Sequence, residues 1–249
     1  MSPSKASPKD NSSSIILPVI YGLIAAIFIT GPSFATPAYG GGQWFAQWDL
    51  GNIPFDSRGV ATNQTATEQA TAASGSTIAS WIGVTKTVSG QPQWMQAGWW
   101  KGAAIGGNCS ASTSQMTLYI EYHDASALGC ETGGQAVEDT EYDYQVWNDG
   151  ALGGGAYKWR ASINGVEEFS YIALDFNSGY TSAGLEVNND SSNTGYGDLN
   201  SLKYKPECSC SWTLWPSRSV FCTDETLYYT NLIVSFDSLD VTDGSGDCD

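Results

Sequence analysis

The side chains of this chain best suited to chemistry are one amide and two carboxylates, each on a segment with strand character. Gln96 is the single amide of the apolar segment 95–98. Glu121 lies in the alternating segment 116–123, and Glu186 follows in the segment 183–187. A carboxylate can activate water as a general base, and an amide can donate to a developing oxyanion. The sequence therefore offers either an amide–carboxylate pair or a pair of carboxylates.

The surroundings of Gln96 form a pattern of two apolar segments around a turn. Residues 81–84 read Trp-Ile-Gly-Val, residues 89–92 read Ser-Gly-Gln-Pro, and residues 95–98 read Met-Gln-Ala-Gly. This pattern resembles the start of the glutamic peptidase (eqolisin) family, where a Trp-Val/Ile-Gly strand precedes a strand reading Leu-Gln-Thr/Ala-Gly. The glutamine of that second strand is catalytic in the family. The resemblance therefore implies a catalytic role for Gln96.

Two later segments extend the resemblance. Residues 119–122 read Tyr-Ile-Glu-Tyr where the family has Trp-Tyr-Glu-Trp, so Tyr119 replaces a tryptophan and Glu121 matches a glutamate that lines the family's cleft. Glu186 stands at the place of the family's catalytic glutamate. It is followed by Asn-Asn-Asp in residues 188–190, and the fungal members carry an Ile-Glu-Asp run there. The resemblance implies a divergent member with Gln96 and Glu186 as its dyad.

The resemblance also implies a substrate site and a reaction. Trp81, Trp94, Tyr119 and Glu121 are expected to bind substrate, because Trp94 shares a strand face with Gln96 and the others belong to the matched segments. The implied activity is an acid-acting endopeptidase, in which glutamate activates water and glutamine stabilises the oxyanion. The implied partner is a polypeptide substrate, with no cofactor.

Two other functions fit the same residues. A glycoside hydrolase would use Glu121 and Glu186 as its carboxylate pair and would not need Gln96. A non-catalytic carbohydrate-binding or surface module would use the tryptophans, whose faces stack on glycans, and would need neither glutamate.

Other kinds of site find little support in the composition. His123 is the only histidine, and no serine lies in a nucleophile-elbow context, so a Ser/His/Asp triad is not expected. The six cysteines lack zinc-ligand spacing, and we expect no metal site. Their even number in an exported chain predicts up to three disulfides, with fifteen possible pairings of which the sequence selects none.

The charge excludes some partners. The chain has 10 basic and 26 acidic residues, a net charge of −16. Without the first 35 residues, which hold Lys5, Lys9 and Asp10, the net charge is −17. Such a surface repels nucleic acid and anionic lipid, and its carboxylates suit an acidic medium. We expect no nucleic-acid partner and a monomer.

The N-terminus has the order of a secretory signal. A polar segment with two lysines precedes an apolar run over residues 15–29, and residues 33–35 read Ser-Phe-Ala, a small-residue cleavage site. The run is shorter than the roughly 20 residues of a spanning helix, although an uncleaved anchor is the alternative. We expect a signal peptide at 1–35, a secreted protein and no stable membrane association after cleavage.

The rest of the chain is expected to be all β. Short alternating segments rich in aromatic and β-branched residues are separated by Gly, Ser, Asn and Asp. They predict an antiparallel two-sheet sandwich of the concanavalin A-like jelly-roll kind, with a linker at 36–42, one domain at 43–236 and an acidic tail at 237–249. Residues 65–77 are predicted as a short helix or a loop. Strands are predicted at 80–84, 93–99, 116–123, 142–147, 157–163, 169–176, 183–187, 199–204 and 231–236.

Overall fold

The computed structural model describes ten segments of the chain, and all their regular structure is β-strand. They are residues 44–49, 57–66, 75–111, 113–124, 126–167, 171–187, 196–206, 211–215, 219–222 and 239–242, of which 44–49, 185–187, 196–198, 219–222 and 239–242 are described for the backbone alone. The predicted signal peptide at 1–35, the linker at 36–42 and the predicted strand at 231–236 lie outside the described residues. Nowhere in these segments is there a helix long and apolar enough to cross a membrane.

The first sheet has seven antiparallel strands in the order β14-β1-β11-β3-β4-β5-β6. Its central strands are long and pair in continuous register, apart from one shift between β4 and β5 after Trp100, because apolar and aromatic residues recur at every second position. The strands are β1 (Trp44–Asp49), β3 (Thr77–Val88), β4 (Gln91–Gly102), β5 (Thr113–His123), β6 (Leu128–Gln135), β11 (Tyr180–Val187) and β14 (Ser219–Cys222).

The second sheet has eight strands and follows the order β10-β8-β7-β2-β12-β13, with β9 paired to β8 and β15 paired to β12. Its β8–β9 hairpin turns at Asn164 and Gly165, which both have positive φ (51° and 74°), as a two-residue Asn-Gly turn requires. The strands are β2 (Gly59–Thr65), β7 (Glu141–Gly153), β8 (Ala156–Ile163), β9 (Val166–Glu167), β10 (Ile172–Leu174), β12 (Tyr196–Tyr204), β13 (Thr213–Leu214) and β15 (Leu239–Thr242).

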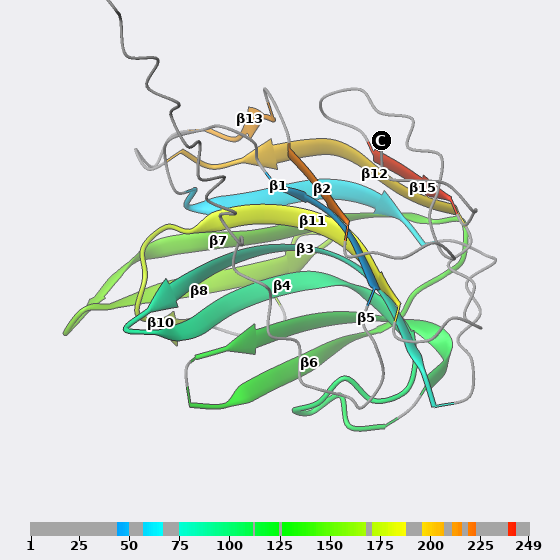
Figure 1. Ribbon diagram of the computed structural model, residues 1–249, viewed down its shortest axis with the longest axis horizontal. Coiled ribbons are helices and arrows are strands. Elements are labelled where there is room, and N and C mark those ends of the chain that lie inside the picture. Colours follow the sequence, from blue (N-terminus) through cyan, green and yellow to red (C-terminus); the bar gives the residue numbers. More distant parts are fainter. Residues whose placement is uncertain are drawn as a thin grey trace, which may run out of the picture. The chain divides into compact units, whose positions relative to one another are not determined.

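The main core lies between the two sheets, which form two layers in Figure 1 with β3 and β4 in front of β7 and β8. The inward positions of β3 and β4 contribute Ile82 and Trp99, and β7 and β8 contribute Tyr144 and Trp159, all of them fully buried. The indole of Trp159 donates to the carbonyl of Phe176 at 2.7 Å, so this core tryptophan satisfies its one polar atom. The predicted antiparallel two-sheet sandwich is confirmed.

A second apolar cluster lies on the opposite face of the seven-stranded sheet. There β3, β4 and β5 present aromatic side chains at several outward positions, and Ile105 and Cys109 of the β4–β5 connection pack against them. Cys109 forms a disulfide with Cys130 of β6. The members of this outer cluster are Ala79, Trp81, Trp94, Trp100, Ile105, Cys109, Tyr119 and Cys130.

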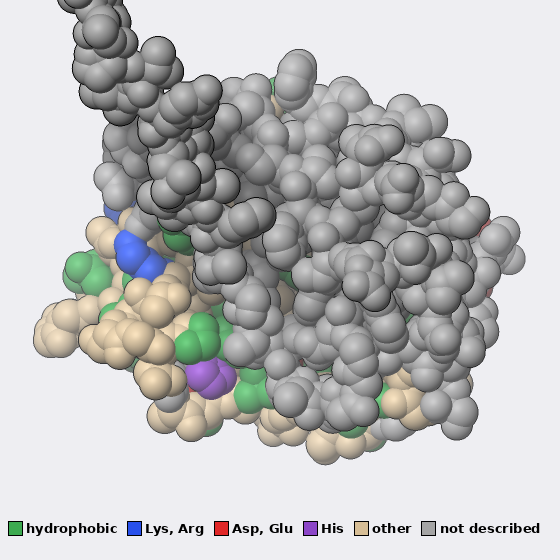
Figure 2. All heavy atoms as spheres, viewed as in Figure 1, with side chains coloured by type: hydrophobic (Ala, Val, Ile, Leu, Met, Phe, Trp, Pro, Cys, Tyr) green, Lys and Arg blue, Asp and Glu red, His purple; other side chains and the backbone are tan. Residues whose placement is uncertain are grey.

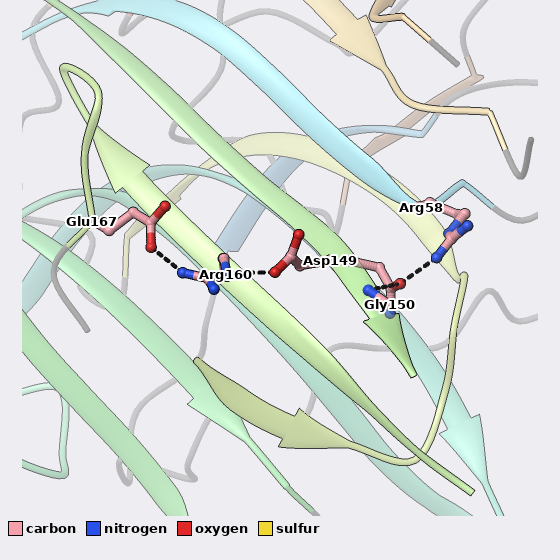
Figure 3. Close-up of polar contacts among 6 residues, drawn as sticks. Arg58, Asp149, Gly150, Arg160 and Glu167 are labelled. Carbon is pink, nitrogen blue, oxygen red and sulfur yellow. Dashed lines mark hydrogen bonds and ion pairs between the residues drawn. The ribbon is translucent and has the colours of Figure 1, made fainter. Parts of the chain in front are cut away.

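The eight-stranded sheet carries ion pairs on its solvent side. Arg160 of β8 pairs with Asp149 of β7 at 2.9 Å and with Glu167 of β9, as Figure 3 shows. Nearby, the side-chain oxygen of Asn148 accepts from Arg58 and from the backbone N–H of Gly150. Exposed pairs of this kind add at most about 1 kcal/mol each, so their main effect is solubility and strand alignment.

The strand predictions differ from the structure at identifiable places. The segment 80–84 extends to β3, 93–99 to β4, and 169–176 shortens to β10. β2 and β6 were not predicted, because one is rich in Thr, Asn and Gln and the other in Gly. The chain from 65 to 77, predicted as a helix or a loop, begins at the last residue of β2 and ends at the first of β3, and residues 67–74 lie outside the described segments. Within the predicted tail, Leu239–Thr242 forms β15.

We expect the Cys109–Cys130 disulfide to stabilise the outer cluster strongly. It closes a loop with a sequence separation of 21 residues, which corresponds to roughly 3 kcal/mol of unfolding free energy. The double variant Cys109→Ala/Cys130→Ala should therefore melt several degrees lower in a thermal scan. An unchanged melting temperature would show that packing alone holds the β4–β5 connection.

Candidate functional site

The outward face of the seven-stranded sheet is organised in cross-strand rows. In an antiparallel pair, residues directly opposite each other point to the same face. The register therefore places six residues side by side in what we call the Gln96 row, on β1, β11, β3, β4, β5 and β6. They are Asp49, Ser182, Gly83, Gln96, Glu121 and Cys130.

The neighbouring rows alternate large and small residues. On one side of the Gln96 row lies the Trp81 row, in which Trp81 stands between two glycines, and beyond it the Trp100 row. On the other side lies the Trp94 row. The Trp81 row is Gly184, Trp81, Gly98 and Tyr119; the Trp100 row is Glu186, Ala79, Trp100 and Thr117; the Trp94 row is Tyr180, Thr85, Trp94 and His123.

Gln96 and Glu121 form a buried polar pair in the centre of this face. Both side chains are almost fully buried, with 4% and 3% of their surface exposed. The amide nitrogen of Gln96 donates a hydrogen bond to the Glu121 carboxylate and lies 3.4 Å from the hydroxyl of Tyr119. The amide therefore has its nitrogen, the hydrogen-bond donor, toward the carboxyl oxygen of Glu121. Among the described residues, the long contact to Tyr119 is the one other partner of this amide nitrogen.

Aromatic contacts hold this pair in place from both neighbouring rows. The ring of Tyr119 packs edge-on against Trp100 with centroids 5.6 Å apart. Trp94 stacks on His123 with centroids 4.5 Å apart and planes 11° from parallel. Nδ1 of His123 lies 2.8 Å from the carbonyl of Pro92, and because a carbonyl only accepts, that nitrogen carries a proton. The histidine side chain is visible at the surface in Figure 2, beside hydrophobic side chains.

The two glycines beside Gln96 and Trp81 differ in how closely their neighbours approach. A Cβ on Gly98 would lie 1.9 Å from the carbonyl oxygen of Ser80, so β3 and β4 tolerate no side chain there. A Cβ on Gly83 would lie 3.1 Å from Cβ of Gln96, which is tight but not prohibitive. Gly83 thus leaves the position between Gln96 and Ser182 without a side chain.

Glu186, the predicted partner of Gln96, lies in β11 as expected. It pairs with Ala79 in the Trp100 row, whereas Ser182 holds the place opposite Gly83 and Gln96. The two positions are four residues apart along β11, or about 13 Å at the usual rise per residue. The side chain of Glu186 lies outside the described side chains, so its pairing with Gln96 remains a prediction.

The structure brings together the other predicted site residues and adds some that sequence reasoning missed. Trp81, Trp94, Tyr119 and Glu121 all lie in the Gln96 row or the rows next to it. Ser182 and Asp49 were missed, although they share the row of Gln96. The missing signal was the strand register, since period-2 alternation within one strand does not show which residues of other strands lie opposite.

A carboxylate also caps the turn that follows β5. Oδ1 of Asp124 accepts from the backbone N–H groups of Ser126 and Ala127, both at 2.9 Å, and from the Ser126 hydroxyl at 2.7 Å. Burial alone would raise the pKa of Asp124, but these hydrogen bonds and the nearby His123 outweigh it and lower that pKa below its ordinary value. The ionised form therefore stabilises the β5–β6 turn next to the site.

No group of three or more His, Cys, Asp or Glu side chains among the described residues is arranged to hold a metal ion.

Comparison with solved structures identifies the fold. The crystal structure of Scytalido-glutamic peptidase with a peptide-based transition state analog matches with a TM-score of 0.54, at 10% sequence identity over 81% of this chain and 98% of that chain. SCP-B, a member of the Eqolisin family of peptidases in complex with the tripeptide Ala-Ile-His, matches with a TM-score of 0.50 at the same identity and coverage. The chain has the fold of the eqolisin peptidases, as its sequence pattern led us to expect. A scan against protein-family models gives no match, and neither does a search of curated proteins.

The two glycines predict different effects of the same substitution. Gly98→Ala forces a Cβ into backbone and should cost several kcal/mol of unfolding free energy, because the strands must separate. Gly83→Ala needs only a shift of a few tenths of an ångström and should cost much less while displacing Gln96. Urea unfolding of both variants measures the loss of unfolding free energy in each. Equal losses in the two variants would contradict the prediction.

The capped turn predicts a pH-dependent contribution to stability. Because folding lowers the pKa of Asp124, its contribution is fully present above the unfolded value of about 3.9 and disappears as pH falls through the folded value. Asp124→Ala should melt lower than the unmodified protein at pH 6 by a few degrees, corresponding to about 1 kcal/mol for the lost hydrogen bonds. The difference should shrink on acidification to pH 2. A difference independent of pH would contradict the role of the ionised carboxylate.

Proposed function

We propose that this protein is a secreted endopeptidase of the glutamic type, which acts in acid on polypeptide substrates and works as a monomer. The observation that carries the proposal is the buried Gln96 amide, held by Glu121 and Tyr119 on the outward face of a sheet with the eqolisin fold. The disulfide between Cys109 and Cys130 is consistent with export to an oxidising compartment.

Gln96 is proposed to stabilise the oxyanion. One N–H of its amide is held by Glu121, which orients the group and polarises it. The second N–H, whose one partner in the described part of the chain is the hydroxyl of Tyr119 at 3.4 Å, turns to the carbonyl oxygen of the scissile peptide as negative charge develops there. A preorganised donor in a buried site stabilises this charge more than water does.

Glu186 is proposed as the general base, with Glu121 as the residue that positions Gln96. The base takes a proton from water, whose oxygen attacks the peptide carbonyl carbon, and then returns the proton to the leaving amine. Glu121 is already bonded to the Gln96 amide, which leaves the base to another carboxylate on this face. The family resemblance assigns that role to Glu186, although the strand register puts Asp49 in the Gln96 row itself.

The aromatic residues around the pair are proposed to bind the peptide. Trp81, Trp94 and Tyr119 come from three adjacent strands and surround Gln96 in register. Two of the solved structures of this fold hold a peptide-based transition state analog and a tripeptide, which supports a polypeptide as the substrate here.

The proposal predicts cleavage of an unfolded protein substrate between pH 2 and pH 6, followed by mass spectrometry of the products. Gln96→Ala should lower kcat by about 100-fold or more, as removal of an oxyanion donor does in other hydrolases. Glu186→Gln should abolish turnover, whereas Glu121→Gln should leave measurable activity because it disturbs only the orientation of Gln96.

The same series includes matched controls. Asp49→Asn tests the other carboxylate near the row and should retain activity, and Glu167→Gln removes a remote surface carboxylate. If Glu186→Gln keeps its activity and either Asp49→Asn or Glu121→Gln loses all activity, the inactive variant identifies the general base. If the folded unmodified protein cleaves no substrate at any pH, the proposed peptidase function is wrong. If the protein hydrolyses glycans and the Gln96→Ala variant still does so, the protein is a glycosidase instead.

A further inference from the structure

We propose that Ser182 is a further catalytic residue, whose hydroxyl donates a second hydrogen bond to the oxyanion from the side opposite Gln96. This inference rests on the proposed peptidase function and adds to it a residue that lies outside the predicted dyad.

The first support is the position of Ser182 in the Gln96 row. Ser182 of β11 pairs with Gly83 of β3, which in turn pairs with Gln96 of β4, so all three point to the outward face. Two strand spacings of about 4.8 Å separate Ser182 from Gln96, which puts their Cα atoms roughly 10 Å apart. Because Gly83 has no side chain, a carbonyl group placed above it would have the amide on one side and the hydroxyl on the other.

The second support is the unsatisfied hydroxyl itself. The side chain of Ser182 is completely buried, and in the described part of the chain its Oγ has no hydrogen-bond partner. An unpaired buried hydroxyl destabilises a fold by about 1–3 kcal/mol. Such a hydroxyl lowers the stability of the fold, and its place in the row of Gln96 gives it a function. It can donate to a ligand that binds there during turnover.

The adjacent residue on the same strand provides an internal comparison. Thr181 is also buried, and its hydroxyl also lacks a partner among the described residues. Thr181 pairs with Val84, a member of the main core, and therefore points to the opposite face of the sheet. Both hydroxyls are buried without a hydrogen-bond partner among the described residues, but of the two only that of Ser182 is on the face that carries Gln96.

In the chemical step, Ser182 acts only as a hydrogen-bond donor, and all atoms, protons and electrons are accounted for without it. Water oxygen bonds to the peptide carbonyl carbon, its proton passes to the glutamate base, and the π electrons of the carbonyl become the oxyanion. The N–H of Gln96 and the O–H of Ser182 bind that oxygen and transfer no proton. The carbon–nitrogen bond then breaks, and the amine leaves with the proton held by the glutamic acid.

The test compares Ser182→Ala with Thr181→Val. Both remove one unpaired buried hydroxyl, so both should melt at the same temperature as the unmodified protein or slightly higher. Ser182→Ala should lower kcat by about 10- to 100-fold with KM changed less than threefold. Thr181→Val should keep kcat. Ser182→Cys keeps the volume and replaces the hydroxyl by a weakly hydrogen-bonding thiol, so it should resemble Ser182→Ala and serves if the alanine variant fails to fold.

A binding measurement separates transition-state stabilisation from a structural effect. A peptide with a phosphinate in place of the scissile bond mimics the tetrahedral oxyanion, and its affinity should fall in Ser182→Ala by the same factor as kcat/KM. The affinity of the Gln96→Ala variant for the uncleaved substrate peptide should not change when Ser182→Ala is added.

The outcomes for the two proposals are distinct. An active unmodified protein with equal kcat in Ser182→Ala, or with equal losses in Ser182→Ala and Thr181→Val, would overturn the role of Ser182 and leave the peptidase intact. An unmodified protein that cleaves no peptide would overturn both.

Discussion

The continuous antiparallel register of β11, β3, β4 and β5 is the constraint on which the site depends. Side chains on a strand alternate between faces, so a fixed register decides which residues of four strands meet on the outward side. The close contact at Gly98 holds β3 and β4 in this alignment, because no other residue fits there. A slip of one residue would move Gln96 into the main core and bring Ala97 to the outward face.

The outer aromatic cluster explains how polar groups stay buried outside the sandwich core. Trp81, Trp94, Trp100 and Tyr119 cover the face with large apolar side chains, and the β4–β5 connection adds Ile105. In such surroundings an amide and a carboxylate are stable only when they satisfy each other, as Gln96 and Glu121 do. The same exclusion of water strengthens any hydrogen bond that the amide makes to a developing charge.

Much of the fold followed from the sequence, and the limits have physical causes. Alternating aromatic and β-branched residues predicted the central strands and the sandwich, and the apolar setting of Gln96 singled it out. β2 was missed because its Thr62 and Gln64 are polar yet buried, and they are stabilised by hydrogen bonds to distant residues that composition does not show. Ser182 was missed because what distinguishes it is a buried hydroxyl without a hydrogen-bond partner among the described residues. That property is visible only in the folded structure.

The β5–β6 hairpin beside the site is fastened in two chemically different ways. At its turn, the carboxylate of Asp124 binds backbone N–H groups, and this fastening weakens when protons are added. Near the start of β6, Cys130 forms a disulfide with Cys109, and this covalent bond is insensitive to pH but is broken by reduction. An acidic medium therefore loosens the turn of the hairpin while the disulfide still holds the first residues of β6, where Cys130 lies opposite Glu121. A reducing medium would do the reverse.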